Sequence, residues 1–242
     1  MTETASLIQV LKLESEKHPA IAIAGGGGKT SLIFRLTEEF VENGKKVIIT
    51  TTTHMAYESD RPFAENGEGM KLSQNLETYG YSVAASLERS KGKIGRLSDE
   101  KLSELREKAD ILLIEADGAK RFPLKVPGEW EPVIPTFADM VIGVIGMDAV
   151  GQSISTVCHR PERVADFLEK EQTDLVTAED VIRIAASENA LKKAVAGRSY
   201  RVFLNKADFP DREQIARNIC RELKKSDIVA AWGSIQRGKY HR

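Results

Sequence analysis

A run of four glycines followed by lysine and threonine is the stretch of this chain most suited to chemistry. It occupies residues 25–31, Gly-Gly-Gly-Gly-Lys-Thr-Ser, and follows a short apolar run. Glycines let backbone N–H groups approach phosphate oxygens, and the N-terminus of a following helix favours an anion. Lys29 would reach the β- and γ-phosphates of a nucleotide, and the Thr30 hydroxyl would ligate Mg²⁺. The predicted nucleotide ligands in this loop are Gly25, Gly26, Gly27, Gly28, Lys29, Thr30 and Ser31.

The loop departs from the full phosphate-loop pattern at one position. That pattern places a further glycine ahead of Gly28, where this chain has Ile23. The run is therefore the short form G-x-x-G-K-T, similar to that of the Mur and folylpolyglutamate ligases, which are ATP enzymes. The alternative is a glycine-rich turn without a ligand, but consecutive glycines would cost a plain turn much backbone entropy. We therefore expect phosphate binding.

Acidic and basic residues follow the apolar run over 111–114. Glu115 or Asp117 would hold Mg²⁺, directly or through water, at the end of this predicted strand. The E-x-x-G spacing that begins at Glu115 resembles metallocentre-maturation GTPases, while Asp117 competes for the same role. Lys120 and Arg121 would stabilise transferred charge beside the γ-phosphate. The alternative is a polar Asp-Gly turn and a solvated loop. The candidate catalytic residues are Lys29, Glu115, Asp117 and Lys120, and the candidate metal ligands are Thr30, Glu115 and Asp117.

The sequence Asn-Lys-Ala-Asp at 205–208 has the residues that G proteins use to hold guanine. Asp208 would accept hydrogen bonds from N1–H and the exocyclic amine of guanine, a pair of donors that adenine lacks. Lys206 would lie along the base plane, and Asn205 would brace the phosphate loop. A serine-containing loop after Trp232 stands where G proteins support the base. The alternative is a strand-to-helix turn with Asp208 as a helix cap, and we favour guanine recognition.

Two further sets of residues have chemistry-bearing side chains. The threonines at 50–53 could ligate Mg²⁺ or orient a water, or they could reflect the preference of threonine for strands. His54 could act as an acid or base, although a lone histidine is more often structural. Cys158 and His159 could be soft ligands for a metal or chalcogen, the alternative being a plain loop that leads into a helix at Pro161.

Strands alternate with helices along the chain, which predicts one α/β domain over 1–242: a three-layer, P-loop NTPase-like, mostly parallel sheet with helices on both faces. Expected strands are 20–24, 46–50, 110–115, 140–146, 201–205 and 227–231. Expected helices are 31–43, 99–108, 161–169, 178–187 and 211–224. Long loops are expected at 54–95 and 119–136, on the edge where open α/β sheets bind ligands.

The composition of the chain excludes some classes of binding partner. The 242 residues are 41% hydrophobic and 29% charged with a net charge of −1, which predicts an ordinary core and no general nucleic-acid surface. No apolar run is long enough to span a membrane. Two cysteines make no disulfide framework, so we expect a cytoplasmic protein. The sequence predicts no oligomeric state.

The motifs together resemble the YqeC family, accessory proteins of selenium-dependent molybdenum hydroxylases. The matching stretches are GGGGKTS, TTTTHM, EADGAKRFPLKVP, EPVIP, VIGVIGMDAVG, CHRPE and NKAD. The resemblance implies a role in making or inserting a selenium-containing cofactor, with a molybdenum hydroxylase or its cofactor as partner. It implies no particular reaction.

Three functions compete at this point. The first is a Mg²⁺-dependent maturation factor that binds and hydrolyses GTP or ATP and switches the loops at 54–95 and 119–136. The second is an ATP-dependent ligase- or kinase-like enzyme that acts on a small cofactor precursor, with Lys120 and Arg121 assisting. The third is a non-catalytic module in which nucleotide only stabilises the fold.

Overall fold

One large sheet runs through the whole molecule. The computed structural model describes residues 5–13 and 19–242. From edge to edge the strands are β13 (Lys239–His241), β12 (Val229–Ser234), β11 (Ser199–Asn205), β9 (Met140–Gly146), β1 (Ala20–Gly25), β7 (Ile111–Glu115), β2 (Val47–Thr51), β5 (Tyr81–Glu88), β6 (Lys93–Gly95) and β3 (His54–Ala56), while β4 (Phe63–Glu65) pairs with β5. The strands from β12 to β5 pair in parallel, and β13, β6 and β3 add antiparallel edges.

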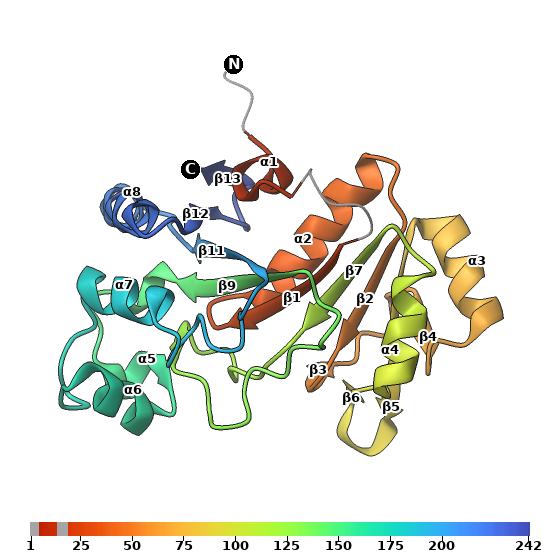
Figure 1. The fold of residues 1–242 in the computed structure, drawn as a ribbon, viewed down its shortest axis with the longest axis horizontal. Helices are drawn as coiled ribbons and strands as arrows, with labels where there is room; N and C mark the ends of the chain where they lie inside the picture. Colours follow the sequence, from red (N-terminus) through yellow and green to blue (C-terminus); the bar gives the residue numbers. More distant parts are fainter. Residues whose placement is uncertain (1–4, 14–18) are drawn as a thin grey trace.

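Helices cover both faces of this sheet (Figure 1). Side chains alternate along β1, so that Ile21 and Ile23 pack with α1 (Leu7–Leu11) and α2 (Lys29–Glu42) on one face. Ala20 and Ala22 face the opposite layer. That layer contains α3 (Gly69–Tyr79), α4 (Asp99–Arg106), α5 (Ile154–Val157), α6 (Pro161–Leu168), α7 (Ala178–Ala186) and α8 (Pro210–Lys225). The predicted three-layer α/β class is confirmed.

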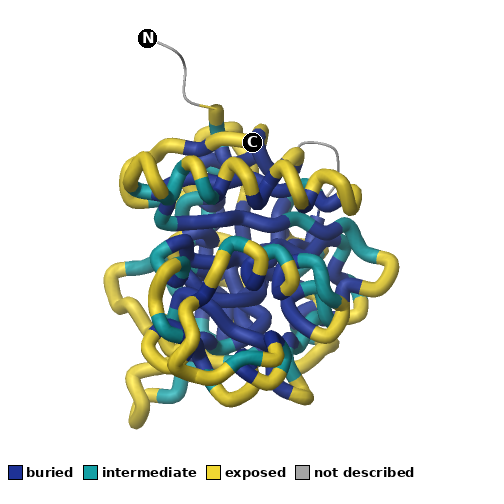
Figure 2. The backbone as a smooth tube through the Cα atoms, turned by 90° about the vertical axis from the view of Figure 1, so that its left-hand side faces the viewer, coloured by how far each residue is buried: buried dark blue, intermediate teal, exposed yellow. Residues whose placement is uncertain are grey.

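The central strands are buried on both faces. All residues of β1, β2, β7 and β9 are buried, as a parallel sheet between two helical layers requires. Viewed from the side of α6 to α8, buried strands lie beneath exposed helical turns (Figure 2). Within the described ranges 5–13 and 19–242, no helix is both long enough and apolar enough to cross a membrane.

The prediction of a long loop at 54–95 is wrong. This segment forms β3, β4, α3, β5, the 3₁₀ turn η1 (Arg89–Lys91) and β6, and it widens the sheet beyond β2. Small residues in β5 such as Ala84 and Ala85 are buried in the hydrophobic clusters on opposite faces of the sheet. By contrast, the only regular element inside 119–136 is β8 (Leu124–Lys125), which pairs with β10 (Cys158–His159).

Parallel strands bring the predicted site residues to one edge of the sheet. The carboxyl ends of β1, β7, β9 and β11 are neighbours there. β1 leads into the glycine run, β7 ends at Glu115, and β11 ends at Asn205. β9 leads into the 3₁₀ turn η2 (Met147–Ala149). Segments far apart in sequence therefore share one site.

Candidate functional site

The glycine run forms a tight loop between β1 and α2. Gly25, Gly27 and Gly28 have φ values of 104°, 73° and 115°, which favour glycine. A Cβ atom at Gly26 would lie 2.6 Å from the Phe122 carbonyl oxygen. A Cβ atom at Gly27 would lie 2.1 Å from the backbone nitrogen of Gly146. The loop thus needs glycine for its turn and for its close packing against neighbouring backbone.

The backbone N–H groups of the loop fall into two sets. Gly25 donates to Asp117, Gly26 to the Val144 carbonyl at 2.9 Å and Gly27 to the Phe122 carbonyl at 3.0 Å. These three glycines therefore shape the loop. In the described part of the chain no acceptor is bound to the N–H groups of residues 28–31, where α2 begins. An anion would meet these four donors and the positive end of the helix dipole.

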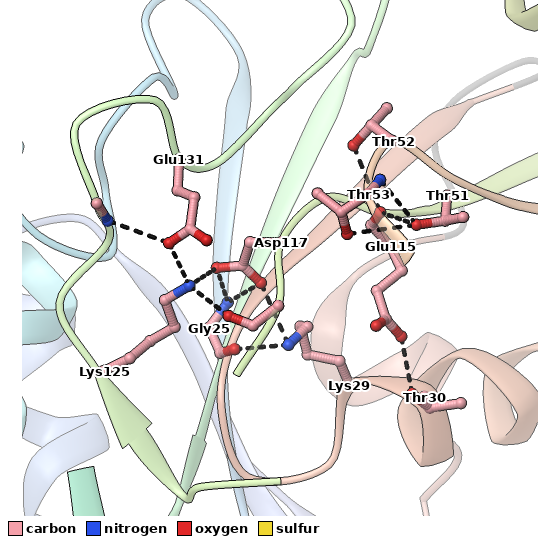
Figure 3. A network of polar contacts seen from close by, with 12 residues as sticks. Gly25, Lys29, Thr30, Thr51, Thr52, Thr53, Glu115, Asp117, Lys125 and Glu131 are labelled. Carbon is pink, nitrogen blue, oxygen red and sulfur yellow. Dashed lines mark hydrogen bonds and ion pairs between the residues drawn. The ribbon is translucent and has the colours of Figure 1, made fainter. Parts of the chain in front are cut away.

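Thr30 and Glu115 meet at the edge of the loop. The Thr30 hydroxyl donates to Glu115 Oε2 at 2.8 Å, which links the first turn of α2 to the end of β7 (Figure 3). Burial raises the pKa of Glu115, the nearby Asp117 raises it further, and Lys29 and Thr30 act in the opposite direction. A hydroxyl and a carboxylate side by side are the hard oxygen ligands that Mg²⁺ prefers.

Asp117 lies in a different network from Glu115. It is fully buried, and its two oxygens lie 3.2 Å from Lys29 Nζ and 3.0 Å from Lys125 Nζ (Figure 3). Lys29 Nζ also donates to the Gly25 carbonyl oxygen at 2.7 Å. Thr30 therefore contacts Glu115, while Asp117 holds the loop lysine. The geometry favours Glu115 over Asp117 as a metal ligand.

Lys125 is a site residue that the sequence analysis missed. Its ammonium group contacts Asp117 and donates to the Gly118 carbonyl at 2.7 Å and to Glu131 at 2.8 Å. Burial alone would raise the pKa of Glu131, but hydrogen bonds from Arg160, Lys125 and Gly128 lower it to about 2. The motif EADGAKRFPLKVP contains three cations, of which the first two are close in sequence to the acidic pair and Lys125 is further away.

Lys120 and Arg121 lie at the tip of a tight turn beside the loop. Phe122 N–H donates to the Ala119 carbonyl at 2.9 Å, and Phe122 in turn accepts from Gly27. Both central residues are exposed and left-handed, with φ of 46° and 67°. That conformation costs about 1–2 kcal/mol for each non-glycine residue. The turn thus holds two exposed cations next to the phosphate loop at some cost to the backbone.

The threonines at the end of β2 hold the backbone in place. Thr51 Oγ1 donates to the Glu115 carbonyl at 3.0 Å, and Thr52 Oγ1 donates to the Val133 carbonyl at 2.7 Å. Their hydroxyl protons are therefore engaged in fixing Glu115 and the following segment. His54 lies on β3, where its Nε2 is 2.7 Å from Glu88. The structure thus places the exposed His54 on the edge strand β3 beside the half-buried Glu88.

Asn205 joins the phosphate loop to the segment that follows β12. Its Nδ2 donates to the Gly27 carbonyl at 2.8 Å, and its Oδ1 accepts from Ile235 N–H at 3.2 Å. Lys206 pairs with Asp148 at 2.7 Å. Asp208 is half-buried, and no hydrogen bond or ion pair engages its carboxylate in the described part of the chain. The N-cap of α8 is Phe209, so Asp208 does not cap that helix.

The structure separates Cys158 from His159. The two residues are neighbours on β10, so their side chains point to opposite sides. Cys158 is fully buried in the core beneath α6 and α7, and burial raises its thiol pKa to about 12. His159 stacks on Phe122 with ring centroids 6.2 Å apart. Of the two alternatives, the structure therefore disfavours a joint soft-ligand site, and the described residues contain no cluster of three or more His, Cys, Asp or Glu that could hold a metal.

The buried thiol gives a direct prediction. In a Cys220→Ala background, Cys158 should react with a disulfide reagent only after unfolding. Burial raises the pKa of the Cys158 thiol to about 12, so very little reactive thiolate is present at neutral pH, and burial blocks access as well. The measurement is the thiol–reagent rate with and without denaturant. Fast reaction of the native protein would show an accessible thiol and restore Cys158 as a ligand.

The chain resembles known proteins along most of its length. The family model described as YqeC protein matches residues 21–162. Protein YqeC of Escherichia coli (strain K12) is 32% identical over 235 residues, covering 94% of this chain and 92% of the relative. The chain belongs to the YqeC family. The matched range contains the phosphate loop, Glu115, Asp117 and Lys125, whereas the Asn205–Asp208 motif of this YqeC-family chain lies beyond it.

Solved structures with a related arrangement are distant. The MinC:MinD cell division protein complex of Aquifex aeolicus matches with a TM-score of 0.45 and 15% identity, over 91% of this chain and 86% of the other. The hydrogenase maturation factor HypB of Archaeoglobus fulgidus matches with a TM-score of 0.42 and 11% identity, over 96% and 87%. The GTPase PAB0955 of Pyrococcus abyssi, in its apo form, matches with a TM-score of 0.38 and 11% identity, over 92% of each chain.

Proposed function

We propose that this YqeC-family chain binds a nucleoside triphosphate with Mg²⁺ and hydrolyses it. The observation that carries the proposal is the contact between Thr30 and Glu115 at the start of α2, beside Lys29. Free N–H groups at residues 28–31 would hold phosphate, Lys29 would neutralise its charge, and Thr30 and Glu115 would hold the metal. Bound Mg²⁺ would supply electrostatic stabilisation of charge on the transferred phosphoryl group.

We propose GTP as the nucleotide. Asn205 ties the phosphate loop to the segment after β12, and Ala207 N–H donates to the Gly233 carbonyl at 3.0 Å. The base-reading motif is therefore held in a fixed position relative to the phosphate loop. The unengaged Asp208 carboxylate would accept from the two donors on the guanine edge. The test compares GTP, ATP, GDP and ADP, with and without Mg²⁺, by thermal shift, because a ligand at 100 times its Kd stabilises by about 2.7 kcal/mol.

We propose maturation of a selenium-dependent molybdenum hydroxylase as the biological role, in the cytoplasm, with the hydroxylase or its cofactor as partner. Membership in the YqeC family supports this role. Nucleotide turnover would drive a change in the segment at 119–136, which contacts the phosphate loop through Phe122. The test is hydroxylase activity in cells that lack this chain, complemented with wild type or with Lys29→Ala. Full complementation by Lys29→Ala would reject a role for nucleotide.

The turn at 119–122 supports a second candidate, an ATP-dependent ligase- or kinase-like enzyme. Two exposed cations held in a costly conformation beside the phosphate loop would suit a second, anionic substrate. The short phosphate loop agrees with this reading. Turnover without any added substrate favours the hydrolytic switch, and turnover only with a cofactor precursor favours the transferase. Tight nucleotide binding without turnover would favour the non-catalytic binding module.

The raised pKa of Glu115 predicts a pH dependence. Metal ligation requires the carboxylate, so Mg²⁺-dependent GTP affinity should rise with pH, by up to about tenfold per unit, until Glu115 is ionised. In the metal-free protein, the stability of the fold has the opposite pH dependence. A raised carboxyl pKa stabilises the fold at low pH, and this contribution is lost as pH rises through the folded value.

The measurement is the GTP Kd from pH 5 to 8 with and without Mg²⁺. Glu115→Gln should remove the pH slope and most of the effect of Mg²⁺, because glutamine can keep the contact with Thr30 and cannot ionise. Thr30→Ala should weaken Mg²⁺-dependent binding more than Mg²⁺-free binding. Asp117→Asn is the matched control and should keep the slope. A slope lost in Asp117→Asn and kept in Glu115→Gln would assign the metal to Asp117.

A further inference from the structure

Lys125 is a charged side chain held in the interior with all of its protons engaged. Its side chain is 0% exposed, and its ammonium group lies against the Gly118 carbonyl, Glu131 and Asp117 at 2.7, 2.8 and 3.0 Å (Figure 3). Lysine is almost never fully buried unless it is paired, because transfer of an ammonium group out of water is strongly unfavourable. The loop at 119–136 thus buries a cation directly behind the phosphate loop.

Asp117 is shared between Lys125 and Lys29. Its two oxygens each accept from the N–H group of Gly25, and each also faces one of the two ammonium groups. In this arrangement Lys29 points back to the base of its own loop, where the Gly25 carbonyl oxygen completes its contacts. To reach a triphosphate, Lys29 must give up its ion pair with Asp117.

A count of charges shows what happens when Lys29 leaves. Asp117 and Glu131 are the acids of the network, and Lys125 and Arg160 are its other cations, with Arg160 Nη1 at 2.7 Å from Glu131. The network without Lys29 is neutral. If Lys125 were absent, departure of Lys29 would leave Asp117 as an uncompensated charge in a fully buried position, which is strongly unfavourable. Asp117 would then hold Lys29 in place.

We propose that Lys125 is a positioning residue for the phosphate site: it neutralises Asp117 so that Lys29 is free to move to the nucleotide. The inference rests on the proposed function and assigns Asp117 a task other than metal binding. This role also couples nucleotide binding to the segment at 119–136. When Lys29 leaves, Lys125 becomes the one lysine that pairs with Asp117, and it still contacts Glu131 in the same segment. The inference makes two predictions that a purely structural role for Lys125 does not.

The first is a rescue of nucleotide binding. Lys125→Met should weaken GTP binding at least about tenfold, the effect of a 1.4 kcal/mol change. Adding Asp117→Asn should restore it to near wild type, because no buried carboxylate then retains Lys29, and Glu131 keeps Arg160 and Gly128 as partners. Lys193→Met is the matched control: Lys193 holds the same segment through the carbonyls of Gly128 and Glu129 without touching Asp117, so GTP binding should be unchanged.

Binding is measured by isothermal titration with GTP and Mg²⁺. If Lys125→Met does not fold, the double variant is compared with Asp117→Asn alone, and the two should bind GTP equally because Lys125 acts only through Asp117. A double variant that binds tenfold more weakly than Asp117→Asn would overturn the inference. So would a Lys125→Met protein that binds GTP like wild type, or one that Asp117→Asn does not rescue.

The second prediction needs no nucleotide. In thermal unfolding, Lys29→Met and Lys125→Met should each lower Tm moderately, and the double variant should lose more than the sum, because only then is Asp117 left without a cation. Additive losses would overturn the inference whether or not nucleotide binds. If the losses are more than additive but the wild type binds no nucleotide, the proposed function is rejected, and with it the movement of Lys29 to phosphate. The sharing of Asp117 between Lys29 and Lys125 would still be supported.

Discussion

Lys29→Ala should remove triphosphate binding while leaving the fold intact. Loss of one partner from a buried, charge-assisted pair costs about 2–5 kcal/mol, which corresponds to roughly 30- to 5,000-fold in Kd. The expected loss is greater for GTP than for GDP, since the ammonium group is proposed to contact the β- and γ-phosphates. Without nucleotide, Tm should fall only moderately and the protein should stay folded, because Lys125 continues to neutralise Asp117.

Equilibrium titration of GTP and GDP against wild type and Lys29→Ala makes the measurement, with Tm as the check on folding. Lys45→Ala is a suitable control, as Lys45 is exposed beyond the C-terminal end of α2 and has no part in the loop. Wild-type GTP affinity in a folded Lys29→Ala protein would reject the phosphate-loop assignment.

Asp208→Asn should change the preferred base from guanine towards xanthine. The carboxylate would accept from N1–H and the 2-amino group of guanine, whereas an amide can donate to the 2-oxo group of xanthine. A polar edge left unpaired against guanine costs about 1–3 kcal/mol, or roughly five- to a hundredfold in affinity. ATP binding should hardly change, because adenine offers neither donor.

Competition of GTP, XTP and ATP against a fluorescent nucleotide would rank the bases for each protein. Asp211→Asn is the matched control: it makes the same chemical change in the first turn of α8, on an exposed residue. If wild type prefers ATP, or if Asp208→Asn leaves the ranking unchanged, Asp208 does not read the base. The ligase-like reading of the short phosphate loop would then lead.

Local patterns along the chain were sufficient to predict the central architecture. Strands that are covered on both faces are apolar at successive positions, so continuous apolar runs predict β1, β7, β9 and β11 from local sequence. The sequence predicts a loop for the segment that forms β5 and its neighbours. The strands β3, β4 and β6 have three residues each, and β5 mixes polar residues with its apolar ones. The place of β5 in the sheet depends on pairing with β2, which a local pattern does not show.

The candidate site, too, is predictable from the sequence only in part. The meeting of Thr30 with Glu115 could be anticipated, because the helix that follows β1 begins beside the end of the adjacent parallel strand β7. The use of Lys125 could not, because only the fold turns the segment after β7 back beneath the phosphate loop and buries that particular lysine. Cys158 and His159 misled for a related reason: adjacent residues suggest one site, but a strand points them apart.

A crystal structure of this chain with Mg²⁺ and a non-hydrolysable GTP analogue tests the central claim most directly. The account predicts phosphates at the N–H groups of residues 28–31, Lys29 moved from Asp117 onto the β- and γ-phosphates, and Asp208 at the guanine edge. The metal should lie against Thr30 and Glu115, with Lys125 still paired to Asp117. Nucleotide bound elsewhere, or bound at the loop with Lys29 still on Asp117, would contradict it.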